Sequence, residues 1–380
     1  MDADFPPDDA TGLDEALDEG LDEEDDSYVD RRFAGRAATI DEATETQRSS
    51  WHRVPGARVS PEEGSVLEFP VERVDSEASE VEQLGTKTKY WVRRPDGSRY
   101  LFKAEEKGTG EDWAEKIACE IAATLHLPHV HYDLAHDVLH DVPGVVSDNF
   151  IRPGEMLVHG NELLMRHDPQ YAGRDGSKQG VPGYTVAAVA EVLATLHPCP
   201  ARFCEDLPPS IETALGTFIG YILLDALLAN QDRHHENWAA IESGGKLWLS
   251  PAFDQGACLA RNLTTEERHK RLTTNDRQQQ IPHFAKRAKS EFMREPTDDP
   301  RASKKLKTRE AWSAFAALDP AAAGVWLQQL TALDEGRVRL LISMVPPHRM
   351  NRTTREFTTR LIFENRRWLL EEGNPQSSPG

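Results

Sequence analysis

Cysteine is scarce in this sequence of 380 residues, and long apolar runs are absent. The four cysteines are scattered and form no CxxC pair, which argues against a disulfide framework or a cysteine-pair zinc site and favours a reducing, cytoplasmic location; they are Cys119, Cys199, Cys204 and Cys258. The longest apolar stretch, residues 215–229, contains Asp225. A membrane-spanning helix needs about 20 apolar residues, and the N-terminus has no basic-then-apolar leader, so we expect no membrane span.

Basic residues are outnumbered, with 44 Lys and Arg against 64 Asp and Glu and a formal net charge of −20. Residues 1–30 contain fourteen acids and no Lys or Arg, which leaves −6 for the other 350 residues. A body so mildly acidic is not expected to bind nucleic acid directly. Because residues 1–50 are acidic and poor in aromatics, we expect them to form a disordered tail, open to a binding partner.

One central stretch predicts a compact catalytic unit. Residues 215–229 predict a buried helix that delivers the polar loop 230–237. After this loop, residues 238–241 and 246–249 predict the two strands of a hairpin around a Gly-Gly turn. The hairpin folds the chain back, so we expect the carboxylate that follows it, Asp254, to return beside the loop.

Asp232, Asn237 and Asp254 suit phosphoryl transfer from a Mg²⁺-bound nucleotide. Protein kinases place an Asp and an Asn five positions apart in the catalytic loop, where the Asp acts on the hydroxyl and the Asn on Mg²⁺, and a later Asp also binds the metal. Asp232 and Asn237 have this spacing. Mg²⁺ prefers oxygen ligands and needs only one or two carboxylates beside phosphates and water. The sequence therefore predicts ATP and Mg²⁺ as cofactors, Asp232 as catalytic, and Asn237 and Asp254 as metal ligands.

These segments depart from the usual protein-kinase signature, because the loop reads Asn-Gln-Asp-Arg-His and the metal Asp lies in Phe-Asp-Gln-Gly. The patterns Asn230-x-Asp-Arg-His-x-x-Asn237 and Pro251-x-Phe-Asp-x-Gly256 instead resemble the HipA-like (HipA C-terminal domain) serine/threonine kinases, a family distantly similar to phosphatidylinositol 3/4-kinases. The resemblance runs from about residue 85 into the C-terminal region and is most specific in the catalytic segment. It implies phosphorylation of a protein substrate, and it places His234 near the transferred phosphate.

A hairpin of residues 84–92 and 100–103 is predicted upstream, and its first segment contains a candidate phosphate-binding loop. We assign a nucleotide role to four residues of this loop, Gly85, Thr86, Lys87 and Thr88, with Lys89 as a further source of positive charge. The family resemblance implies that a hydroxyl in this loop is autophosphorylated and that the phosphate switches the enzyme off. The alternative is that the threonines simply favour the strand.

Lys103 ends this hairpin, and the next segment predicts a helix from Glu111 with an apolar stripe at four-residue spacing, formed by Trp113, Ile117, Ile121 and Leu125. In kinases a strand Lys contacts the phosphates and is held by a Glu on the following helix. Glu115 and Glu120 flank the stripe almost symmetrically, so periodicity leaves both open. The family resemblance favours Glu115 as the partner of Lys103.

Outside the catalytic segments the sequence predicts mostly regular structure. Residues 51–82 are expected to be an irregular covering, residues 130–134 and 142–150 to be strands, and residues 185–197 to be a helix that Pro198 stops. Residues 286–309 hold nine Lys or Arg against four acids and predict a solvated helix and loop, or else a surface for an acidic partner. Residues 311–372 predict helices with breaks at Pro320 and at Pro346–Pro347. His129 and His131 alternate along a predicted strand, so we expect ordinary core or surface histidines there.

We therefore expect an α+β, bilobal protein-kinase-like fold. Its strand-rich N-lobe would cover residues 51–150 and its helical C-lobe residues 151–372, between disordered segments at residues 1–50 and 373–380. The expected function is ATP- and Mg²⁺-dependent phosphorylation of Ser or Thr on a protein. Two alternatives stay open: a lipid or small-molecule kinase of the phosphatidylinositol-kinase type, and an inactive nucleotide-binding scaffold.

Overall fold

The computed structural model describes residues 67–75, 80–81, 88–94, 97–106, 108–171, 181–294 and 305–374. From Glu68 onward these residues belong to one structural unit. The predicted acidic tail (residues 1–50) lies outside the described residues, as do three members of the predicted phosphate-binding loop, Gly85, Thr86 and Lys87.

A six-stranded sheet occupies the first part of the unit, in the order β1-β5-β6-β4-β3-β2. β1 runs parallel to β5, and the other neighbours are antiparallel. The predicted hairpin is formed by β3 and β4, whose register places Lys89 opposite Lys103. The strands of this sheet are β1 (Val71–Val74), β2 (Glu80–Val81), β3 (Lys89–Arg93), β4 (Arg99–Ala104), β5 (Asp133–Asp137) and β6 (Val142–Asp148).

Two sequence predictions for this sheet are corrected. Residues 71–74, expected to be irregular, form β1, because they pair with β5 along their whole length. The strand expected at residues 130–134 begins only at Asp133. The reason is that Val130 donates its backbone N–H to Ala252 O at 2.8 Å, so the segment before β5 pairs with the later catalytic region rather than with the sheet.

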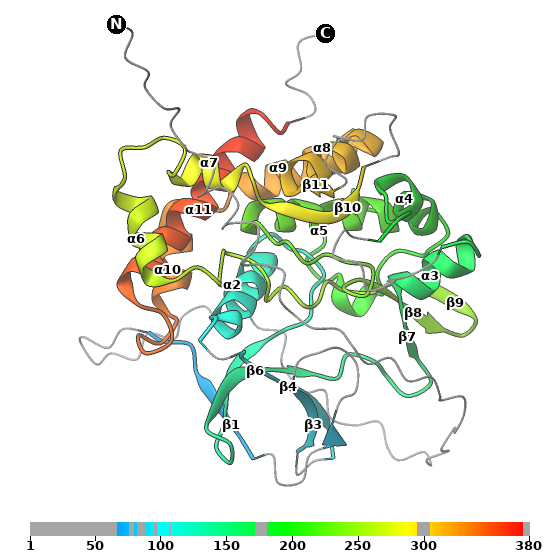
Figure 1. Cartoon of the computed structure of the whole chain (residues 1–380). Helices are drawn as coiled ribbons and strands as arrows, with labels where there is room; N and C mark the ends of the chain where they lie inside the picture. The colour runs from blue at the N-terminus through cyan, green and yellow to red at the C-terminus, as the bar shows by residue number, and fades with distance from the viewer. Residues whose placement is uncertain are drawn as a thin grey trace, which may run out of the picture. The chain divides into compact units, whose positions relative to one another are not determined.

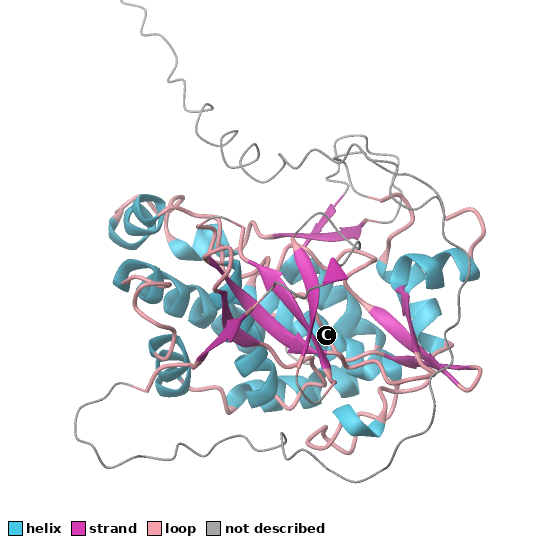
Figure 2. Cartoon of the chain, turned by 90° about the horizontal axis from the view of Figure 1, so that it is seen from below, coloured by secondary structure: helices cyan, strands magenta, loops and turns pink. Residues whose placement is uncertain are grey.

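Helix α2 (Glu111–Thr124) contacts β5 and β6 and connects the sheet to the helical part of the unit. Its predicted apolar stripe is buried, with Ile117, Ile121 and Leu125 at 0 % exposure. Figure 1 shows α2 between the sheet and the remaining helices. Viewed from the sheet side, the strands lie in front of the helices (Figure 2). One large apolar core therefore extends from α2 into the helical part.

The helical part surrounds α5 (Ala214–Leu228), which is buried along nearly its whole length. The helix predicted from the apolar residues 215–229 is confirmed, and a helix that is apolar on nearly all sides packs inside a core. A three-stranded sheet, β7-β8-β9, lies beside it and contains the predicted hairpin, with bounds β7 (Met156–His159), β8 (Ala239–Ser243) and β9 (Lys246–Leu249). Among the described residues before residue 300, the other helices are α3 (Gly160–His167), α4 (Val186–Ala194), α6 (Thr265–Thr273) and α7 (Ile281–Ala285), with a 3-10 turn η1 at Ala201–Phe203.

The basic run at residues 286–309 differs from its prediction. Two short antiparallel strands, β10 (Lys289–Met293) and β11 (Lys305–Lys307), stand where a solvated helix and loop were expected. Phe292 is buried against Tyr184, with ring centroids 4.7 Å apart. The buried Phe292 ring therefore holds this segment against the rest of the protein, although the charge of the segment alone predicted exposure to solvent.

The C-terminal region is helical, as predicted, with breaks at Pro320 and at Pro346–Pro347. One further break was not expected: Asp334 caps a new helix by accepting a hydrogen bond from the Arg337 backbone at 2.7 Å. The helices are α8 (Thr308–Leu318), α9 (Pro320–Thr331), α10 (Glu335–Ser343) and α11 (Arg352–Glu371). None of the helices in the described ranges is both long and apolar enough to cross a bilayer.

Candidate active site

The predicted catalytic loop starts where α5 ends. Ala229 adopts a left-handed conformation at φ 52°, which terminates the helix and turns the chain into the loop. Asp225, one turn earlier, accepts two hydrogen bonds of 2.8 Å from the Arg233 guanidinium and one of 2.8 Å from Asn230. These side chains are buried. A buried bidentate ion pair thus fixes the loop on the rigid core helix.

Asp232 and Asn237 lie together in this loop. The Asn237 amide donates to the Asp232 backbone carbonyl at 2.7 Å and approaches the Asp232 carboxylate at 3.4 Å. Arg233 supports the far end of the loop by donating to Asn237 O at 2.8 Å. The amide nitrogen of Asn237 is therefore engaged within the loop, which leaves its carbonyl oxygen as the atom suited to a metal.

His234 lies beside Asp232, with His234 Nε2 3.7 Å from a carboxylate oxygen of Asp232. Its neighbour His235 has a different setting, because it is buried and its Nδ1 lies 2.6 Å from the Tyr171 hydroxyl. The two adjacent histidines therefore differ in environment: His235 is buried against Tyr171, and His234 lies beside Asp232.

Lys103 and Asp254 meet although they are 151 positions apart in the chain. The Lys103 ammonium contacts the Asp254 carboxylate directly, and it lies 3.2 Å from Glu115 Oε2 and 3.1 Å from Glu111 Oε1. Glu120, the alternative partner considered from the sequence, instead pairs with Lys116 at 2.7 Å. The structure therefore places Glu115 against Lys103.

Burial and neighbouring charges have opposite effects on the pKa values of Lys103 and Glu115. Burial by itself lowers the pKa of Lys103, but the carboxylates of Asp254, Glu115 and Glu111 outweigh it and hold the pKa well above its ordinary value. Burial raises the pKa of Glu115, and the Lys103 ammonium opposes that rise. Lys103 consequently remains a cation, positioned by carboxylates from a helix and from a distant loop.

The segment after β9 brings Asp254 to this point. Asp254 has a left-handed backbone at φ 55°, a conformation that Asp tolerates better than most residues and that is found at functional sites. Gln255 donates its backbone N–H to Glu115 Oε1 at 2.6 Å. A Cβ at Gly256 would lie 2.7 Å from Glu111 Cγ, so only glycine allows this close approach to α2.

The two catalytic segments are also joined to each other. The Asn230 side chain donates to Gln255 Oε1 at 3.2 Å, and the Gln231 backbone reaches Ala257 O at 3.5 Å. A continuous polar network thus runs from Lys103 through Glu115 and Gln255 to the loop that carries Asp232.

Two members of this network, Glu111 and Tyr132, were not predicted, and Lys89 was predicted only as a source of positive charge. Glu111 is one turn before Glu115 on the same helix face, and this i, i+4 spacing was the available signal. Lys89 lies 3.6 Å from Asp254, and its position opposite Lys103 follows from the hairpin register. The Tyr132 hydroxyl accepts the Asp254 N–H at 3.4 Å, a contact across 122 positions for which the sequence has no local signal.

The predicted phosphate-binding loop is described only at Thr88. Thr88 is exposed, and its carbonyl accepts the Ala104 N–H at 3.0 Å at the entrance of β3. Lys89 follows at once and contacts Asp254. The described end of this loop therefore leads directly into the cluster of Lys103 and Asp254.

The chain is similar to several solved structures. The Helicobacter pylori proinflammatory kinase CtkA superposes with a TM-score of 0.58 at 18% identity, covering 81% of this chain and 98% of CtkA. A Shewanella oneidensis toxin–antitoxin complex of HipA, HipB and operator DNA matches with a TM-score of 0.44 at 13% identity, covering 79% of this chain and 66% of that one. The Golgi casein kinase matches with a TM-score of 0.39 at 12% identity, covering 80% of this chain and 74% of the other.

The match to CtkA confirms the predicted α+β kinase-like fold. The predicted resemblance to the HipA-like kinases is therefore supported as far as the fold is concerned. No protein-family model matches the sequence, and no curated protein matches it.

Proposed function

We propose that this chain is an ATP- and Mg²⁺-dependent kinase that phosphorylates Ser or Thr hydroxyls of a protein. The observation that carries the proposal is the buried cluster in which Lys103 contacts Glu115 and Asp254. A strand Lys, a helix Glu and a returning Asp are the elements that kinases use to hold the nucleotide phosphates and the metal. A kinase-like fold supports this interpretation.

The cluster suits a bound cation. Glu111, Glu115 and Asp254 bring three carboxyl groups against the two ammonium groups of Lys89 and Lys103. Mg²⁺ prefers carboxylate and amide oxygens, which Asp254 and Asn237 supply. When bound, Mg²⁺ neutralises charge on the nucleotide phosphates. Lys103 would orient the phosphates, and Glu115 would keep Lys103 in place.

Asp232 is the proposed catalytic residue. Its carboxylate would orient the attacking hydroxyl and accept its proton as the bond from this oxygen to the γ-phosphorus forms, while the bond from the γ-phosphorus to the bridging oxygen breaks and ADP leaves. The Asn237 amide at the Asp232 carbonyl and the Asp225–Arg233 pair hold the loop, so Asp232 does not have to be ordered at the moment of reaction. His234 beside Asp232 is proposed to lie near the transferred phosphate.

The test uses ATP labelled at the γ-phosphate, with Mg²⁺ and the full chain. Three acceptors are offered in parallel: the chain itself, a mixture of dephosphorylated proteins, and vesicles that contain phosphatidylinositol. A parallel reaction with ATP labelled at the α-phosphate controls for transfer of the nucleotide. We expect γ-label, and no α-label, on Ser or Thr of protein.

The acceptor decides between the proposal and its alternatives. Label on lipid alone would replace the protein-kinase assignment by a lipid kinase. If nucleotide binds and no acceptor is labelled, the chain is a nucleotide-binding scaffold. Either outcome overturns the proposed protein kinase activity.

A further inference from the structure

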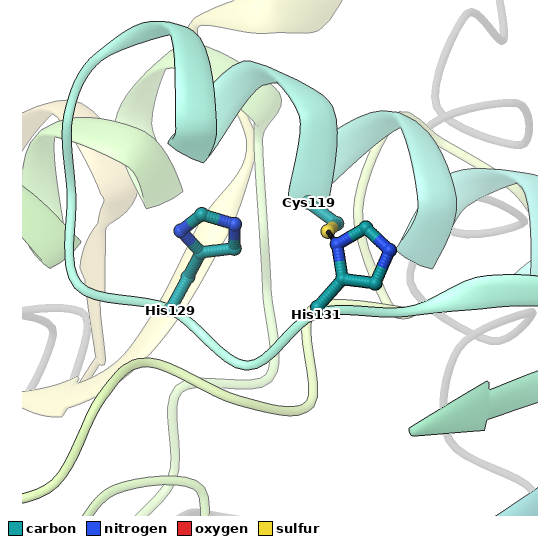
Figure 3. Close-up of side chains that lie close together, drawn as sticks. All are labelled: Cys119, His129 and His131. Carbon is teal, nitrogen blue, oxygen red and sulfur yellow. Dashed lines mark hydrogen bonds between the residues drawn. The ribbon is translucent and has the colours of Figure 1, made fainter. Parts of the chain in front are cut away.

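A cluster of one cysteine and two histidines begins on α2 one turn after Glu115. Cys119 is on α2, while His129 and His131 are on the segment between α2 and β5 (Figure 3). One ligand atom from each of the three residues lies within 4.8 Å of the other two. Cys119 is buried, His129 is half-buried and His131 is exposed, so the cluster reaches from the core to the surface. The sequence predicted ordinary histidines here, because the pairing with Cys119 arises only in three dimensions.

The hydrogen bonds of the two imidazoles define which nitrogens face the thiol. His129 donates through Nδ1 to Leu127 O at 2.7 Å, so its Nε2 carries the free lone pair. His131 lies 3.2 Å from Asp133 Oδ2 through Nε2, and its Nδ1 lies 3.7 Å from Cys119 Sγ. A carbonyl or carboxylate on the outer nitrogen is the arrangement that orients metal-binding histidines in proteins.

The distances agree with a tetrahedral site. Zinc–sulfur and zinc–nitrogen bonds of about 2.3 and 2.1 Å at a tetrahedral angle separate the two ligand atoms by about 3.6 Å. The separation of Cys119 Sγ and His131 Nδ1 is already 3.7 Å. The widest separation in the cluster, up to 4.8 Å, has to shrink by about 1 Å. Because Cys119 and His131 already have the required separation, the adjustment has to bring His129 closer to them.

Neighbouring charges change the pKa values of the cluster. Burial raises the pKa of the Cys119 thiol, but His129 and His131 outweigh this and lower it to about 6. Hydrogen bonds to Asp133 and Cys119 raise the pKa of His131 to about 10. A metal-bound thiol is deprotonated and metal-bound imidazoles are neutral, so metal binding has to release protons from these residues. The Lys116 ammonium nearby is neutralised by Glu120 and Asp133, at 2.7 and 2.9 Å.

We propose that Cys119, His129 and His131 form a three-ligand site for a zinc-class divalent cation, with the fourth position open to water. Catalytic zinc sites have three protein ligands, whereas structural sites close all four positions. The position of the site suggests a structural consequence of binding. Cys119 is one turn after Glu115 on α2, and Val130 between the two histidines pairs with Ala252, two residues before Asp254. A metal would therefore clamp α2 to the segment that supports Asp254.

Binding is tested directly, without reference to kinase activity. Full-length protein without an affinity tag is stripped with chelator and titrated with Co²⁺ in excess Mg²⁺, which occupies oxygen-rich sites. We expect one Co²⁺ per chain with a thiolate-to-cobalt charge-transfer band in the near ultraviolet. Zn²⁺ should displace it with equal stoichiometry. The thiolate band distinguishes this site from Asn237 and Asp254, which contain no sulfur.

Variants define the ligands. Cys119→Ser should abolish the charge-transfer band, and His131→Asn, at an exposed position that spares the core, should weaken binding by more than about 100-fold, since one of three ligands is lost. Asp133→Asn should weaken it by about 10–100-fold, as for other residues that orient a ligand. Cys204→Ser is the matched control and should change nothing.

Three results would overturn the site. The first is the absence of stoichiometric Co²⁺ or Zn²⁺ binding to folded wild-type protein, and the second is binding that His131→Asn leaves unchanged. The third is a thiolate band that persists in Cys119→Ser or disappears in Cys204→Ser. If metal binds as expected but no phosphoryl transfer is found, the metal site stands while the proposed kinase function fails.

Discussion

Replacing Lys103 by Met tests the buried cluster through stability. Methionine has a similar length and no charge, so the change removes the ammonium and keeps most of the volume. Glu115 and Glu111, at 0 and 2 % exposure, would then lose their contact with Lys103 at 3.2 and 3.1 Å. Removing one partner of a buried ion pair costs about 3–5 kcal/mol of folding free energy.

Protonation of a buried carboxylate sets an upper limit on the folding free energy that the variant loses. A carboxyl with the ordinary pKa of 4.5 is protonated at pH 7.5 at a cost of about 4 kcal/mol, since each pKa unit is worth 1.36 kcal/mol. At pH 5.5 the same protonation costs about 1.4 kcal/mol. Without the Lys103 ammonium the folded-state pKa of Glu115 is raised further above its unfolded value than in the wild type, so the variant gains more stability than the wild type as pH falls. The deficit relative to wild type should therefore shrink by about 2–3 kcal/mol between pH 7.5 and 5.5.

The measurement is urea unfolding followed by fluorescence of the eight tryptophans, at both pH values. Lys89→Met is the matched control, because Lys89 is partly exposed and lies 3.6 Å from Asp254. Lys89 is less buried than Lys103 and, among the described residues, has one carboxylate partner rather than three, so the control should lose less stability than Lys103→Met. The reasoning is refuted if Lys103→Met is as stable as Lys89→Met at pH 7.5, or if its deficit stays the same at pH 5.5.

Three further predictions concern the nucleotide, the loop and the tail. Asp254→Asn should weaken Mg-ATP binding, by about 10-fold or more in a titration with Mg²⁺, because a charged oxygen ligand is lost; unchanged affinity contradicts the metal role. Phosphopeptide mass spectrometry after incubation with Mg-ATP should find phosphate on Thr86 or Thr88, with lower ATP affinity as about −2 charge is added beside the nucleotide. Finding phosphate only at other sites would contradict the predicted phosphorylation of this loop. Deleting residues 1–50 should leave the melting temperature nearly unchanged, and a fall of many degrees would show that the tail is part of the fold.

Local patterns predicted the parts of the fold that depend on neighbours in the chain. The apolar stripe of α2 and the largely apolar sequence of α5 predicted two helices, and both are confirmed. The Gly-Gly turn predicted a hairpin, which is formed by β8 and β9. These elements follow from periodicity and turn chemistry, which operate over a few residues.

Contacts between distant segments could not be predicted from such patterns. β1 has few buried residues, and its strand conformation depends on pairing with β5, some 60 positions later. The Asp225–Arg233 pair could be suspected from its spacing, but its role in holding Asn237 depends on the folded loop. The Cys119, His129 and His131 cluster likewise forms only when α2 lies against the next segment. In each case the deciding contact is tertiary.

Asp232→Asn, assayed for both nucleotide binding and γ-phosphate transfer, tests the central claim most directly. The substitution keeps the shape of a side chain that the Asn237 amide approaches at 3.4 Å, but it removes the base for the attacking hydroxyl. We predict ATP affinity within a few-fold of wild type and transfer reduced by about 10²–10⁴-fold. Wild-type turnover in purified Asp232→Asn protein would contradict the assignment of the catalytic loop.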